Sequence, residues 1–143
     1  MNKIPKAAVL FAPTSKTNGH TVSGYCDMNG FDFAILHVLA TTADVVSNKP
    51  SVLDIRAGST TVATNGATFS GCKSGTDYTI PNAVTSAPNS YMFPLDWRGK
   101  ARYLSVTVSP RTTQIISAVA MLYRADEMPD NSTEAGVLLL HVA

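Results

Sequence analysis

The sequence predicts an all-β fold, a two-sheet antiparallel sandwich of jelly-roll or related Greek-key topology, and three observations lead to this prediction. No stretch of the 143 residues has the apolar spacing of an amphipathic helix, so the crossover helices that parallel strands need are not expected. Short apolar or alternating runs recur instead, separated by turn residues at intervals of about 8–12 residues. The two longest such runs in the last third of the chain, residues 101–109 and 113–124, flank one polar turn and are expected to pair.

The turn residues divide the chain into about ten candidate strands. Asn29-Gly30 is a strong hairpin signal. Pro94 has no N–H to donate to a ladder, so its strand belongs at a sheet edge or in a bulge. Residues 14–19 are expected to form a turn and residues 82–90 an exposed loop. The strands are expected at residues 6–12, 20–28, 31–42, 51–57, 60–63, 76–80, 91–95, 101–109, 113–124 and 136–142.

The alternation within these runs predicts which side chains are buried. Both faces of residues 31–42 are largely apolar, so this strand is expected to be buried on two sides or to meet a partner subunit. Asp54 and Arg56 share one face, where a solvated ion pair is expected. Trp97 with Arg98 is expected to fix a turn by arginine stacking on an aromatic ring. The residues expected to fill the core are Leu104, Val106, Val108, Val119 and Met121.

Composition limits the classes of partner. We expect a single domain over residues 1–143, with residues 1–13 forming a first strand or an extended arm rather than a signal peptide. The charged fraction is 15%, and the net charge is +1. Such a charge provides little attraction for nucleic acid or an anionic membrane, and no apolar run reaches the roughly 20 residues that span a bilayer. We therefore expect no nucleic-acid partner, no membrane partner and synthesis in the cytosol.

The residues that usually carry chemistry are scattered. The three histidines, His20, His37 and His141, have no ligand spacing, and the carboxylates form no evident pair. Cys26 and Cys72 are expected to be free, half-buried thiols, with a disulfide left open if their strands are neighbours. We therefore assign no catalytic, cofactor or metal residue and predict that the chain is not an enzyme.

One stretch resembles a known family. The order Asp96-Trp97-Arg98-Gly99, Arg102-Tyr103-Leu104, a strand, a turn, Ile116-Ser117-Ala118-Val119-Ala120 and Arg124-Ala125 is similar to that of small head decoration, or cement, proteins of tailed phages. The resemblance covers about residues 91–125. It implies a β-sandwich on the outer surface of the virion capsid that bridges neighbouring capsomers. It also implies the major capsid protein as partner and a homodimer, with a homotrimer as the alternative, and it transfers no contact residue.

The residues themselves suggest where such contacts would lie, and they leave two other functions open. Apolar terminal strands are natural candidates for β-augmentation between chains, and the loop at residues 82–90 is a further candidate. A carbohydrate- or receptor-binding sandwich would instead need an exposed aromatic platform, for which Tyr78, Tyr91 and Trp97 are candidates. A jelly-roll enzyme would need a metal triad. The candidate assembly contacts are Ile4, Val9, Phe11, Asn89, Leu138, Leu140 and Val142.

Overall fold

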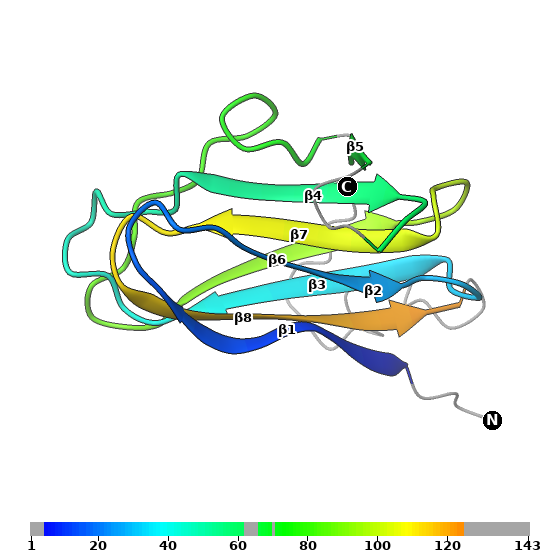
Figure 1. Ribbon diagram of the computed structural model, residues 1–143, viewed down its shortest axis with the longest axis horizontal. Helices are drawn as coiled ribbons and strands as arrows, with labels where there is room; N and C mark the ends of the chain where they lie inside the picture. The colour runs from blue at the N-terminus through cyan, green and yellow to red at the C-terminus, as the bar shows by residue number, and fades with distance from the viewer. Residues whose placement is uncertain (1–4, 62–65, 70, 125–143) are drawn as a thin grey trace, which may run out of the picture.

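The fold is a sandwich of two antiparallel sheets, which confirms the predicted class. The computed structural model describes residues 5–61, 66–69 and 71–124, and these contain strands and no helix. Figure 1 shows the sheets stacked, with β4 and β7 above β3 and β8. The strands are β1 (Lys6–Lys16), β2 (Val22–Asp27), β3 (Phe33–Ala40), β4 (Val52–Gly58), β5 (Ala67–Thr68), β6 (Asn89–Asp96), β7 (Tyr103–Ser109) and β8 (Gln114–Tyr123).

The strand order is that of a jelly roll. The first sheet has the order β1-β8-β3-β6 and the second the order β2-β7-β4-β5. β1 pairs with β8, β2 with β7, β3 with β6 and β4 with β5, so the chain is an antiparallel ribbon that doubles back after β4. Winding this ribbon into two layers gives the jelly roll. The pairs β3–β8 and β4–β7 then join successive turns of the ribbon.

This winding overturns two predicted pairings. Residues 101–109 and 113–124 correspond to β7 and β8, which lie in different sheets and do not pair. The Asn29-Gly30 turn likewise joins β2 to β3 across the two sheets, with Gly30 at a positive φ of 88°. A turn signal shows where the chain reverses. It does not show whether the next strand returns beside the last one or crosses to the other layer.

The core lies between the sheets, and one predicted part of it is wrong. β8 turns Ile116, Ala118, Ala120 and Leu122 inward, whereas Val119 and Met121 are half-exposed on the opposite face. Both faces of this strand are apolar, so alternation alone does not choose between them. The fully buried large side chains of the core include Leu36, Val38, Leu53, Ile55, Leu95, Leu104, Val106, Val108, Ile116 and Leu122, which confirms the predicted placement of the three β7 residues.

Both edges of the first sheet contain a proline. Pro94 lies in β6 opposite Ile35, and its edge position confirms the prediction. The prediction that the first strand ends before Pro13 is wrong, because β1 continues to Lys16. Its register against β8 shifts between Val9 and Phe11 and again before Thr14. An edge strand tolerates proline because one side of its backbone makes no ladder hydrogen bonds.

The segment after β5 differs most from the prediction. Residues 76–80 form no strand, and an isolated bridge joins Ser74 to Tyr78 instead. The Asp54 carboxylate shapes this segment by accepting hydrogen bonds from Ser74 N (2.8 Å) and Ser74 Oγ (2.9 Å). Asp54 is buried, so the expected solvated pair is wrong, and Arg56 Nη2 lies 4.0 Å from its Oδ2.

The remaining predictions in this part of the chain have separate outcomes. The short β5 was not predicted. The part of the strand expected at residues 60–63 that the structure describes, 60–61, is not a strand. Residues 62–63 and the strand expected at 136–142 lie outside the described residues.

The two open sides of the sandwich are closed differently. On one side β1 and β2 approach so closely that a Cβ on Gly24 would lie 2.1 Å from the carbonyl oxygen of Leu10. On the other side aromatic rings fill the gap. Phe69 stacks on Trp97 at 5.3 Å, and Tyr78 meets Phe93 edge to face at 5.9 Å.

The two adjacent isoleucines of β8 test the assignment of its faces. Ile116 is 0% exposed and Ile115 is 50% exposed. We expect Ile116→Ala to lower the free energy of unfolding by about 2–5 kcal/mol, because it leaves a cavity in the core. Ile115→Ala should cost less than about 1 kcal/mol. Urea unfolding at low protein concentration measures both, and equal losses would contradict the assignment.

Candidate assembly surface

The side chains of the first sheet that point away from the core form a continuous surface, called here the outer face. Successive residues of a strand alternate between the two sides of a sheet, and the alternating burial of β3 and β8 follows this rule. The outer face therefore consists of every second residue of four strands. Its members are Ala7, Val9, Ser15, Phe33, Ile35, His37, Leu39, Ser90, Met92, Pro94, Asp96, Ile115, Ser117, Val119, Met121 and Tyr123.

The register places these side chains in rows across the sheet. His37 of β3 is opposite Val119 of β8 and Met92 of β6, and Val119 is in turn opposite Val9 of β1. A parallel row contains Ala7, Met121, Ile35 and Pro94. Directly opposed side chains lie about 5 Å apart, so each row forms one contact surface.

The outer face is apolar and open. Val9 is 62% exposed, Met92 60%, Ile115 50% and Leu39 38%. These four side chains come from all four strands of the first sheet, so the apolar surface extends from one edge of the sheet to the other. The corresponding face of the second sheet is more polar. It includes Ser23, Asp27, Arg56 and Thr107, the buried Asp54 and Ser105, and the two rings of Tyr25 and Tyr103.

Charge is confined to one end of the outer face. Asp96 is its one Asp, Glu, Lys or Arg side chain, and His37 and Tyr123 are its other titratable groups. At that end, Arg98 donates to both carboxylate oxygens of Asp96 at 2.9 and 2.6 Å. These bonds lower the pKa of Asp96. The Arg98 guanidinium also lies 5.0 Å from the centre of the Phe33 ring, so the expected arginine stacking occurs on Phe33.

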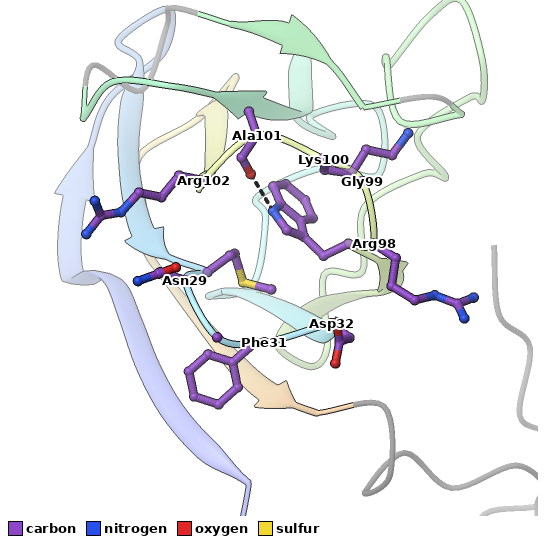
Figure 2. Close-up of a pocket in the computed structure, with 11 residues that line it drawn as sticks. Asn29, Phe31, Asp32, Arg98, Gly99, Lys100, Ala101 and Arg102 are labelled. Carbon is purple, nitrogen blue, oxygen red and sulfur yellow. Dashed lines mark hydrogen bonds between the residues drawn. The ribbon is translucent and has the colours of Figure 1, made fainter.

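A cleft at the end of the sandwich is the second candidate site. It has a volume of about 330 Å³ and lies between the turns at residues 28–32 and 97–102. Its rim carries Arg98, Lys100 and Arg102, but Figure 2 shows the guanidinium groups of Arg98 and Arg102 pointing away from each other on opposite sides. Arg102 donates to both oxygens of Asp27 at 3.0 and 2.8 Å. Both arginines are thus paired with carboxylates and do not converge on a common ligand position.

The aromatic side chains offer no exposed platform at the predicted positions. Trp97 is buried, and its Nε1 donates to the carbonyl oxygen of Ala101 at 2.7 Å, which closes the turn (Figure 2). Tyr78 and Tyr91 are partly buried and pack against the core, and the Tyr78 hydroxyl donates to the carbonyl oxygen of Leu53. These three rings therefore stabilise the sandwich from within.

The structure places the predicted assembly contacts in different surroundings. Val9 lies on the outer face, whereas Phe11 packs against the core after the first register shift of β1. Asn89 is buried, and its side chain accepts from Val84 N and donates to the carbonyl oxygens of Thr41 and Val84. Asn89 thus holds the exposed loop before β6 in place. Ile4, Leu138, Leu140 and Val142 lie outside the described residues.

The groups associated with metal or redox chemistry stand apart. Cys26 and Cys72 are free, as predicted, and both are fully rather than half buried. Among the described residues, no three His, Cys, Asp or Glu side chains form a group that could hold a metal ion. Within the same part of the chain, no helix is long and apolar enough to cross a membrane.

Sequence reasoning missed most of the outer face, although a signal for it was present. The second apolar face of residues 31–42 already pointed to burial on two sides or to a partner subunit. The same property of residues 113–124 was interpreted as core. No protein-family model matches this chain, and no curated protein matches it either. Fold and surface together therefore define a structural class, a jelly-roll sandwich with one largely apolar outer face.

The Asp27–Arg102 pair has a measurable consequence for pH dependence. The hydrogen bonds from Arg102, followed by that from the N–H of Asn29, lower the pKa of Asp27 to about 2. Arg102→Gln should raise this pKa toward the ordinary value of 3.8. The contribution of the pair to the free energy of unfolding is therefore present above pH 3.8 and is lost as the pH falls toward 2, where Asp27 becomes protonated in the folded chain.

Carboxyl-carbon NMR titration of the wild-type chain and the variant measures the Asp27 pKa directly. The exposed Arg111, which lies in the turn between β7 and β8, provides the matched control Arg111→Gln. If the pKa of Asp27 is the same in Arg102→Gln as in the wild-type chain, Arg102 is not the cause of the lowered pKa.

The two thiols should be unreactive while the chain is folded. Burial raises the pKa of Cys26 to about 12 and that of Cys72 to about 11. The thiolate is the reactive form, so a disulfide reagent at pH 8 should modify neither residue until unfolding. Timed labelling with and without denaturant measures this, and rapid labelling of the native chain would be the contrary result.

Proposed function

We propose that this chain is a non-enzymatic structural protein, a decoration or cement protein that binds the outside of a tailed-phage head and bridges neighbouring capsomers. The observation that carries the proposal is the apolar outer face of the first sheet, whose single charged side chain, Asp96, lies at one end. Soluble monomers rarely leave a contiguous apolar patch of more than a few hundred Å² exposed, and a larger patch marks an interaction surface. The partners proposed are the major capsid protein and further copies of this chain.

The location of this surface supports an assembly role. The outer face lies on regular strands, whose side chains are held by cross-strand pairs. A rigid sheet face suits a protein that must fit a repeating lattice of identical sites. Many weak contacts made at once can bind such a protein firmly, because attachment at one site raises the effective concentration at the next.

The resemblance supports the particular partner. Residues 91–125, which carry the resemblance to head decoration proteins, include β8 and nearly all of β6, two of the four strands that form the outer face. The alternative of a carbohydrate- or receptor-binding module gains no comparable support, because Tyr78, Tyr91 and Trp97 are engaged in packing.

The protein composition of purified phage particles tests this function. We expect the chain to be present in virions in a fixed ratio to the major capsid protein, near the number of capsomer contact sites. Quantitative mass spectrometry of particles purified from the phage that encodes the chain gives that ratio. A handful of copies per particle would point to the tail, and absence from virions would refute the proposal.

A further inference from the structure

We propose that two copies of this chain pack against each other through the outer face of the first sheet, sheet against sheet. This inference rests on the proposed function and deepens it, because it names the first partner that the same surface takes. It concerns the chain free in solution, before any contact with a particle. The argument uses the charge of the face, its extent and its position in the fold.

The charge pattern suits pairing of the face with itself. In a two-fold dimer the same patch lies on both sides of the interface, so any like charges near the axis would meet and repel. Asp96, the one carboxylate of the outer face, lies at its end and is paired with Arg98, and the other side chains of the face carry no carboxylate, ammonium or guanidinium group. His37 at its centre has the apolar Val119 and Met92 as its cross-strand neighbours.

The extent of the face matches a weak dimer. Four strands at a spacing of about 4.8 Å and eight residues at about 3.3 Å span roughly 500 Å² on each copy. Two such faces would bury roughly 1,000 Å², which is close to the lower limit for a specific interface. Interfaces of this size belong to weak or transient complexes, so we expect the dimer to exchange with monomer in solution. On a particle surface, where many copies lie side by side, the same contact would add to the others.

The position of the face leaves it accessible to a second copy. The face belongs to one layer of the sandwich, and the second sheet packs on the opposite side of that layer (Figure 1). Val9 and Met92, the two large apolar side chains with the highest fractional exposure among the described residues, come from the two edge strands, so the exposed apolar surface spans the full width of the sheet. The outer surface of the second sheet is more polar and has no such row of exposed aliphatic side chains across the described strands.

Sedimentation of the full chain over a range from about 1 to about 500 μM tests the inference. We expect a monomer–dimer equilibrium. Met92→Asp and Val9→Asp should each raise the dissociation constant by at least about tenfold, since a charge would be buried against apolar side chains. Ser23→Asp is the matched control, because Ser23 is exposed on the opposite sheet and should leave the equilibrium unchanged.

Circular dichroism shows whether each aspartate variant is folded. If one is not, Met92→Ser or Val9→Ser takes its place and should also weaken the dimer. A wild-type chain that stays monomeric throughout the range would overturn the inference. So would a trimer, or a dimer that Met92→Asp leaves intact or that Ser23→Asp disrupts equally. The virion ratio is measured independently, so a monomer found in virions would refute this inference and leave the proposed function standing.

Discussion

The rest of the structure depends on the register in which β3 pairs with β8. The two strands are far apart in the chain, yet they match without interruption from Phe33 opposite Tyr123 to Ala40 opposite Ile116. In this register Leu36 lies opposite Ala120, so a large side chain meets a small one within the core. A slip of one residue would turn one strand's core side chains to the other face. The same register that fills the core therefore also determines which apolar residues lie outside.

The sequence was sufficient where a property depends on neighbouring residues, and insufficient where it depends on distant pairing. The sandwich class and the edge position of Pro94 follow from local patterns, and both are confirmed. Which face of β8 packs into the core does not follow from a local pattern, because Ile115, Val119 and Met121 are as apolar as the residues that face the core. Residues 76–80 look like a strand, but the Asp54 carboxylate, some twenty positions earlier, binds Ser74 and shapes the segment differently.

The candidate surface is a product of the winding of the ribbon. Apart from the β4–β5 pair, consecutive strands of this jelly roll lie in alternate layers, so the outer face combines strands from the beginning, middle and end of the chain. No short motif can encode such a surface, because its members are spaced along more than a hundred residues. The stretch that resembles decoration proteins accordingly supplies only two of the four strands.

The stacking of Trp97 on Phe69 makes intrinsic tryptophan fluorescence a probe of this part of the fold. Trp97 is the one tryptophan in the sequence, and it sits where the segment after β5 meets the turn between β6 and β7. Its emission therefore depends on whether this side of the sandwich is closed. The indole is buried away from the outer face, so association through that face should leave the emission nearly unchanged. Folding and association can thus be followed separately in the same sample, without any added label.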